Sequence, residues 1–397
     1  AGASNASGAI VADAGNITAT GRDITAAADE DLTLSAEKGT IAAKDVTATN
    51  VQAKTLTASG DVTVTDGVLN TKDASSVDSL ALNNASGVVG ELTAGATTLS
   101  NGSSLSAEKL IMSGDLTVGS NADTKGGTTL MVDALNLGGN DLLIDPAWGT
   151  ASTNVAVGSF TGTTVADVEI NGNVGVGMNS MAAIGTTDTS WLAGQVNAAT
   201  NGAGLTENGV DSALGIYTAQ VLGSGKGINV DGTQTTGSFT ITADQLDFSG
   251  KSLLVVNADA ALAPAGALSA AATSTANIAD GAKLRIAGAE VGETYKVLGT
   301  NIDTINKTGE AWSNANFSTD SLMVAGGAFD AATGTIKTSL NSARNAFPTL
   351  DNELADVLDA GYLNHEIGTA DKYVNAEAKG ARFLSRATSR NYIGGDA

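Results

Sequence analysis

The sequence predicts an all-β protein, a right-handed parallel β-helix (β-solenoid) with a C-terminal cap and a short α-helical tail. Three observations support this prediction. Short strand-forming words recur in the N-terminal part, glycine accounts for 49 of 397 residues against 3 prolines, and aromatic residues make up only 4%. A β-helix needs tight corners, hydrogen bonds on both sides of each strand, and few bulky side chains in a narrow interior.

The first strands are predicted from a repeated four-residue word. Each word holds an aspartate or asparagine, then an isoleucine, leucine or valine, then threonine, then a small or apolar residue. The words are Asn16–Ala19, Asp23–Ala26, Asp31–Leu34, Asp45–Ala48 and Asp61–Val64. Alternation of this kind is typical of a half-buried strand, so we expect the apolar residues to face inward and the threonines to face solvent. Strands this short need neighbours stacked above and below them.

Similar words continue with wider spacing through the next part of the chain. They are Leu80–Leu82, Glu91–Ala94, Leu105–Ala107, Asp115–Val118, Leu135–Leu137 and Asp141–Pro146. Residues 146–240 are less regular, and we expect longer loops there, with a helix-compatible stretch at 191–199. Strands are expected again at 238–242, 246–248 and 253–256. An antiparallel sandwich is the alternative fold, although its strands usually recur every ~8–12 residues.

Three regions are expected along the chain. Residues 1–277 form the solenoid, and residues 278–345 form a cap in which larger side chains shield the end of the core. Residues 346–397 form a helical tail. Its apolar residues have helical spacing and precede Gly361, a plausible C-cap, and three later arginines would form a basic stripe. The residues are Leu350, Leu354, Val357 and Leu358, followed by Arg382, Arg386 and Arg390.

Part of the C-terminal third resembles a known family. The segments are Gly292–Leu298, Trp312, Asn316–Phe317, Ser321–Val324 and Asp330–Ile336. They resemble the C-terminal passenger region of type V autotransporters, where this region often acts as an autochaperone. The stretches Asn140–Trp148 and Gly175–Trp191 also resemble passengers of large gut-bacterial autotransporters.

The resemblance implies a secreted passenger whose outer-membrane barrel is missing from this sequence. It also implies that the helical tail joins the passenger to that barrel, and that the passenger is displayed on, or released from, the surface of a Gram-negative bacterium. The first residues, Ala1–Ser4, fit a mature chain from which a signal peptide has been removed. We therefore expect an extracellular or cell-surface location.

Charge and cysteine content exclude several kinds of partner and site. The chain has 20 Lys and Arg against 42 Asp and Glu, a net charge of −22, and no cysteine. Nucleic acids and anionic membranes require clustered basic residues, so we expect neither as a partner. Without cysteine there is no disulfide, no thiolate nucleophile and no cysteine-ligated metal.

No residue pattern predicts catalysis. His365 is the only histidine, and no Gly-x-Ser-x-Gly elbow accompanies it. Asp133, Asp141 and Asp145 could serve a polysaccharide-active enzyme, but no arginine lies between Arg22 and Arg285 to support them. Gly223–Gly227 resembles a phosphate-binding loop without its first glycine and its final serine or threonine. We therefore predict no catalytic, cofactor-binding or metal-binding residue, no cofactor, and no enzymatic activity.

The sequence favours a structural or adhesive rod. Its expected partner is a ligand on a host cell or a neighbouring cell, either a protein or a glycan. The first alternative is a subunit that self-associates into an extracellular fibre or surface layer. The second is a polysaccharide-active β-helix enzyme.

Overall fold

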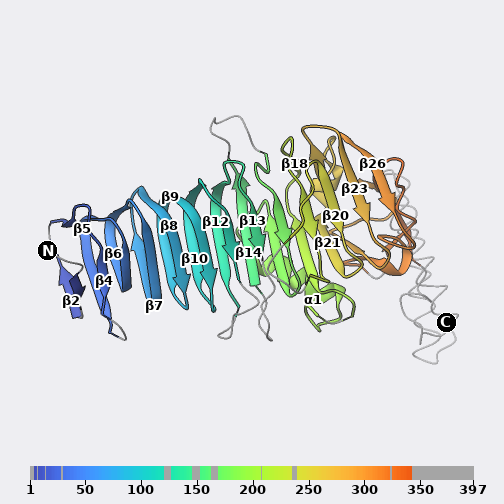
Figure 1. The fold of residues 1–397 in the computed structure, drawn as a ribbon. Helices are drawn as coiled ribbons and strands as arrows, with labels where there is room; N and C mark the ends of the chain where they lie inside the picture. Colours follow the sequence, from blue (N-terminus) through green and yellow to red (C-terminus); the bar gives the residue numbers. More distant parts are fainter. Residues whose placement is uncertain are drawn as a thin grey trace, which may run out of the picture.

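The computed structural model describes most of the chain up to residue 341. The described residues are 4–6, 8–13, 15–27, 30–119, 127–144, 153–161, 169–206, 208–234, 239–321 and 324–341. The protein is all-β, with 24 strands of the described part in one sheet. Figure 1 shows these strands side by side in an elongated stack that follows the order of the sequence.

The strands are short near the N-terminus, long through the next part of the chain, and short again beyond it. They are β1 (Ser4–Ala6), β2 (Gly8–Val11), β3 (Ile17–Ala19), β4 (Ile24–Ala26), β5 (Leu32–Ala43), β6 (Val46–Ala58), β7 (Asp61–Thr71), β8 (Ser75–Asn83), β9 (Ser86–Ser100), β10 (Ser104–Met112), β11 (Leu116–Val118), β12 (Thr129–Asn136), β13 (Leu142–Ile144), β14 (Thr153–Phe160), β15 (Val174–Val176), β16 (Ser180–Ile184), β17 (Ser212–Ile216), β18 (Gln220–Leu222), β19 (Ile228–Val230), β20 (Gln245–Phe248), β21 (Ser252–Asn257), β22 (Leu268–Ala270), β23 (Ser274–Ile278), β24 (Lys283–Ala287), β25 (Thr294–Lys296), β26 (Ile302–Lys307), β27 (Phe317–Thr319), β28 (Val324–Gly326) and β29 (Thr335–Leu340). The helices are α1 (Thr189–Ala199), α2 (Ala258–Leu262) and the 3-10 helix η1 (Asn314–Asn316).

Parallel pairing joins equivalent positions of successive strands into columns. Column 1 contains the register partners Ile10, Leu34, Val51, Leu69, Gly87, Leu105, Leu130, Val155, Ala182, Leu214, Leu254, Leu284 and Phe317. Nearly all of its members are buried. Partners in neighbouring strands stand ~4.8 Å apart, so the twelve steps of column 1 span ~58 Å.

Two further columns of register partners contribute to the same hydrophobic core. Column 2 runs through Leu92, Leu110, Leu135 and Phe160. Column 3 runs through Ile24, Val46, Val62, Leu80, Thr97, Leu116, Leu142, Val174, Ile228, Leu246 and Ala276. The core is therefore made of valine, leucine and isoleucine stacked on their like, which agrees with the low aromatic content.

The predicted words coincide with strands, and their register is correct. Val46 is 0% exposed while Thr47, the next residue of β6, faces solvent. Ile17, Ile24, Leu32 and Val62 are buried in the same way. The later words from Leu80 to Ile144 also lie in strands, from β8 to β13. The inward and outward assignment of the N-terminal strands is thus confirmed.

Several strands are longer than the words that predicted them. The buried residues Val46, Val51 and Leu56 all lie in the single strand β6, which has 13 residues. Its ladder with β5 shifts register between Ala36 and Thr40, where the chain bends. The backbone stays extended through such corners, so consecutive words join into one strand.

The strand predicted at residues 238–242 is wrong for its described part. Residues 239–242 are not in a strand. Phe239 instead lies across Gly175, where an added Cβ would be 2.8 Å from the ring, and the Thr240 carbonyl accepts a hydrogen bond from Asn229 Nδ2 at 3.1 Å. Gly175 and Asn229 are register partners in β15 and β19. Residues 239–242 therefore lie on the outer surface of the sheet, where the Phe239 ring covers Gly175.

The helix-compatible stretch at 191–199 is confirmed as part of α1. Asp188 caps the helix by accepting a hydrogen bond from Ser190 N at 2.9 Å. Leu192 and Val196 pack against Ala183 and Val255 on the outer face of the sheet, forming a second hydrophobic core.

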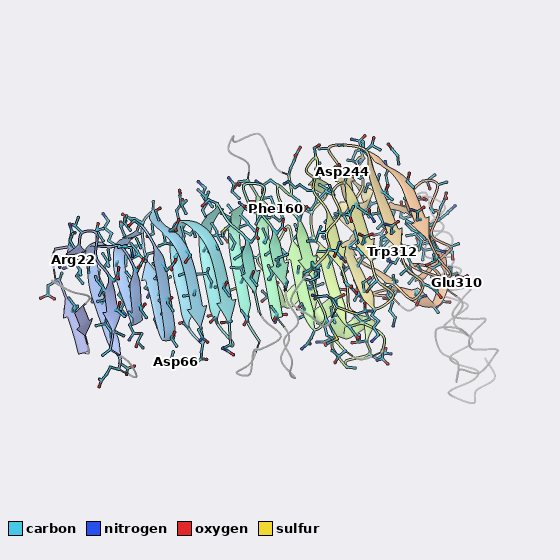
Figure 2. The ribbon with its side chains drawn as sticks, in the orientation of Figure 1. Arg22, Asp66, Phe160, Asp244, Glu310 and Trp312 are labelled. Carbon is cyan, nitrogen blue, oxygen red and sulfur yellow. The ribbon has the colours of Figure 1, made fainter. Side chains whose placement is uncertain are left out.

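A small antiparallel sheet follows the parallel stack. The strand β29 pairs with both β25 and β28 in antiparallel fashion, while parallel pairing in the large sheet extends to β27. Trp312 is fully buried beside it, with ring centroids 4.9 Å from Phe248 and 5.1 Å from Phe329. Its place among the last strands is visible in Figure 2. Larger side chains do gather here, as the sequence predicts.

The tail predictions concern residues outside the described part of the chain. These are the helix at Leu350–Leu358, the arginine stripe and His365. The division into regions at 1–277, 278–345 and 346–397 stays a prediction.

Candidate binding groove

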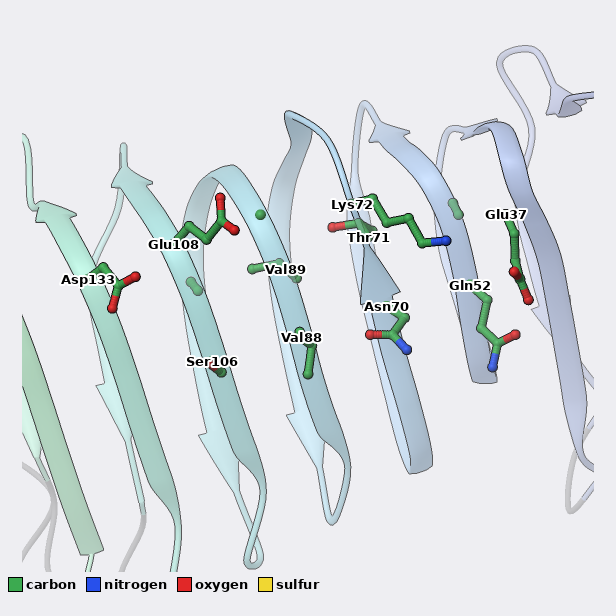
Figure 3. A pocket seen from close by; sticks show the side chains of 13 residues that line it. Glu37, Gln52, Asn70, Thr71, Lys72, Val88, Val89, Ser106, Glu108 and Asp133 are labelled. Atoms are coloured by element: carbon green, nitrogen blue, oxygen red, sulfur yellow. The ribbon is translucent and has the colours of Figure 1, made fainter. Parts of the chain in front are cut away.

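A groove lies on the outer surface of the sheet, across the strands from β5 to β12. Its volume is about 580 Å³, within the range of small-molecule and oligomer sites. Figure 3 shows its side chains spread along the stack direction instead of along one strand. The residues that line it are Glu37, Gln52, Ala53, Asn70, Thr71, Lys72, Val88, Val89, Gly90, Ser106, Ala107, Glu108 and Asp133.

The floor of the groove is one outward-facing column. Gln52, Asn70, Val88 and Ser106 are successive register partners in β6, β7, β9 and β10. Each follows a column 1 residue by one position, so the pleat turns it to the outside. Val88 is 58% exposed, whereas most described valines are buried. We call this set, with its continuation along the stack, the floor column.

Charged side chains stand along the groove, three of them within β5, β10 and β12 and one directly after the end of β7. They are Glu37, Lys72, Glu108 and Asp133. None of them forms an ion pair with another described residue, although neighbouring lysines do. Lys54 lies 3.2 Å from Asp73, and Lys109 lies 3.5 Å from Glu91. The groove therefore offers three free carboxylates and one free ammonium group.

Gly90 and Thr71 also line the groove. At Gly90 an added Cβ would lie 2.5 Å from the Lys72 carbonyl oxygen, so only glycine permits this approach of the two strands. Thr71 is 4% exposed, and its hydroxyl has no hydrogen-bond partner in the described part of the chain.

The same floor column is covered further along the stack. After Ser106 it continues through Met131, Ala156, Ala183, Gly215 and Val255. Helix α1 packs on this part, and an added Cβ at Gly215 would lie 2.7 Å from the Trp191 ring. One face of the sheet is thus polar and open at one end, and apolar and covered at the other.

A second hollow, of about 450 Å³, lies over β19, β20, β23 and β26. Its polar side chains bind one another. Asn277 Nδ2 donates to Asp247 Oδ1 at 2.7 Å, and Asn306 Nδ2 donates to Asn277 Oδ1 at 2.9 Å. This ladder satisfies its own hydrogen bonds and supports the fold.

The structure separates the aspartates that the sequence groups together. Asp133 lines the groove, whereas Asp141 lies in a hydrogen-bonded corner. Its N–H donates to Asp115 Oδ1 at 3.0 Å and its Oδ1 accepts from Asn173 Nδ2 at 2.7 Å. Asp145 lies outside the described residues.

The phosphate-loop likeness of Gly223–Gly227 has a structural explanation. Gly225 N donates to Asp244 Oδ1 at 2.7 Å, and Gly227 N donates to Asn173 Oδ1 at 2.8 Å. Lys226 Nζ donates to the Gly139 carbonyl at 3.0 Å. These donors hold together distant parts of the chain.

Sequence reasoning did not find the groove. The groove could be found from the polar residues that directly follow column 1 residues, such as Gln52 and Asn70. Aligning these residues with one another requires the register between strands. Among the described residues, no group of three or more carboxylate or imidazole side chains is placed to hold a metal ion. No helix of the described part is long and apolar enough to cross a membrane.

The comparisons with known proteins give no assignment. No protein-family model, curated protein or solved structure matches the chain significantly.

Proposed function

We propose that this chain is an adhesive, rod-shaped passenger of the autotransporter type. It is displayed on or released from the surface of a Gram-negative bacterium after passing through an outer-membrane barrel, and it binds a ligand on a host or neighbouring cell. The proposal includes the finer fold, a right-handed parallel β-helix.

The fold proposal is supported by the regular return of the chain to the same columns. Contacting side chains of adjacent strands are 17 or 18 residues apart near the N-terminus, as for Asn50 with Thr33 and Asn101 with Asn83. Three columns of parallel register partners, two of them running along most of the stack, are what a β-helix with three faces would present.

The adhesive role is supported above all by the groove. It joins six strands into one outward-facing polar surface whose charged and amide groups are not used inside the fold. Because this surface lies on the side of the rod, it can contact another cell without disturbing the pairing between stacked strands.

The test uses beads coated with the purified chain, applied to epithelial cell layers and to layers of bacteria. Coated beads are expected to adhere well above albumin-coated beads. Adhesion equal to that of albumin on both layers would overturn the adhesive role. Electron microscopy of the same sample separates the alternative, because single short rods support the adhesin and long filaments favour the self-assembling fibre.

A further inference from the structure

We propose that the groove between Glu37 and Asp133 binds a neutral, extended, β-1,4-linked oligosaccharide that lies along the stack. This inference rests on the proposed adhesive function and names the ligand class of that surface.

The first argument is the free hydrogen-bonding capacity of the floor. The side chains of Gln52, Asn70 and Ser106 form no hydrogen bond with another described residue. Comparable side chains outside the groove are engaged, since Asn50 Nδ2 donates to Thr33 Oγ1 at 3.1 Å on the same strand as Gln52. An amide offers donors and acceptors side by side, which suits the paired hydroxyls of a sugar ring.

The second argument is spacing. Floor residues repeat every ~4.8 Å along the stack, which is close to the length of one pyranose unit in an extended β-1,4-linked chain. From β5 to β12 there are five steps, or ~24 Å, so about five units fit. A chain that coils, such as an α-1,4-glucan, would leave this line of contacts.

The third argument is the exposed valine. Val88 lies between Asn70 and Ser106 in the floor column with 58% of its surface exposed. The C–H face of a pyranose ring can cover it while the ring hydroxyls reach the amides on either side. Val88 thus supplies an apolar contact between polar side chains that can fix the orientation of a ligand.

The fourth argument is charge. Glu37, Glu108 and Asp133 outnumber Lys72, and the whole chain carries −22. Carboxylates accept hydrogen bonds from sugar hydroxyls but repel uronates and sulfates. The groove therefore selects neutral chains over acidic ones.

Isothermal titration of the whole chain tests this inference. The probes are cellohexaose, mannohexaose and xylohexaose, with maltohexaose as the coiled control and hexagalacturonate as the acidic control. We expect at least one of the first three to bind saturably, at least tenfold more tightly than both controls. If none of the three binds at millimolar concentration, or either control binds as tightly, the proposal is overturned.

Two multiple-substitution variants and one control variant locate the site. Gln52→Ala/Asn70→Ala should weaken binding at least tenfold with an unchanged melting temperature, since both side chains face solvent. Thr47→Ala, exposed on another face of β6, should leave binding unchanged. Glu37→Gln/Glu108→Gln/Asp133→Asn should raise affinity for hexagalacturonate. Binding that survives the double substitution would place the ligand elsewhere and overturn the assignment.

The bead assay keeps this inference separate from the proposed function. Beads that adhere although no neutral oligosaccharide binds would refute the glycan groove and leave the adhesin intact. Beads that fail to adhere although cellohexaose binds the groove would refute the adhesive role alone.

Discussion

The guanidinium group of Arg285 pairs with the carboxylate of Asp320 while Arg285 itself is only 3% exposed. Arg285 continues the floor column beyond Val255. Its Nε donates to Gln195 Oε1 of α1 at 2.6 Å, and its Nη1 donates to the Thr319 carbonyl at 2.8 Å. Burial lowers the pKa of Arg285, and the charge of Asp320 opposes that shift. One side chain thus connects α1, β24 and the end of β27.

Removing Asp320 should therefore destabilise the protein. We expect Asp320→Ala to cost about 2 kcal/mol, the range for a lost hydrogen bond to a charged group. The cost stays below that of a fully buried pair because the Asp320 side chain is 46% exposed. Urea unfolding measures this loss in the free energy of unfolding. In the Arg285→Met background the same Asp320→Ala change should cost much less, and an equal cost in both backgrounds would show that the pair does not interact.

The alternation in β6 predicts opposite outcomes for adjacent substitutions. Val46→Asp places a charge in column 3 without a counter-ion and should cost several kcal/mol. Thr47→Asp changes an exposed side chain and should alter stability by less than about 0.5 kcal/mol. Thermal unfolding compares the two variants. Equal destabilisation would contradict the register of the N-terminal strands.

The cap of α1 should contribute to the acid sensitivity of the fold. Hydrogen bonds from the Ser190 side chain and backbone N–H hold the pKa of Asp188 below its usual value of 3.8. A lowered pKa in the folded state stabilises the fold above pH 3.8, and this contribution disappears as pH falls through the lower value.

Asp188→Asn keeps an acceptor at the cap and removes the titration. We expect the variant to resemble the parent near pH 7 and to lose less stability than the parent between pH 5 and 2. Urea unfolding over this range is the measurement. Parallel stability curves for the two proteins would contradict the role of Asp188.

The length of column 1 predicts the shape in solution. Twelve steps give ~58 Å before the antiparallel strands β25, β28 and β29 are added, whereas a compact chain of this size has a radius of gyration of ~21 Å. Small-angle scattering should give a skewed distance distribution with a long tail. A symmetric distribution that ends near the diameter of such a compact sphere, about 55 Å, would contradict the rod.

The sequence predicts the core better than the surface, for a physical reason. Val46, Val62 and Leu80 are found from sequence because burial alternates locally along each strand. Gly87 breaks the column 1 pattern because Leu105, whose Cδ1 would lie 2.7 Å from an added Cβ, occupies the space above it. No local pattern reveals such a pairing.

The groove and the outer coverings depend on contacts between distant residues. The Trp191 ring packs against Gly215, and the Phe239 ring packs against Gly175, because a glycine has no side chain to occupy the space on the outer surface of the sheet. The alignment of Gln52 with Asn70 depends on the number of residues in the intervening corner. These contacts depend on the register between strands, which cannot be derived from the residue pattern of a single strand.

The distance in sequence between register partners varies along the chain without disturbing the columns. Contacting side chains are 18 residues apart at Asn101 and Asn83 but 40 apart at Lys251 and Asp211. Elsewhere the register partners Ser180 and Ser212 are 32 positions apart, and the segment between them contains α1, which packs on the outside of the sheet. New segments can therefore be gained or exchanged at corners while the interior keeps its alignment. A scaffold of this kind can diversify its exterior by insertion.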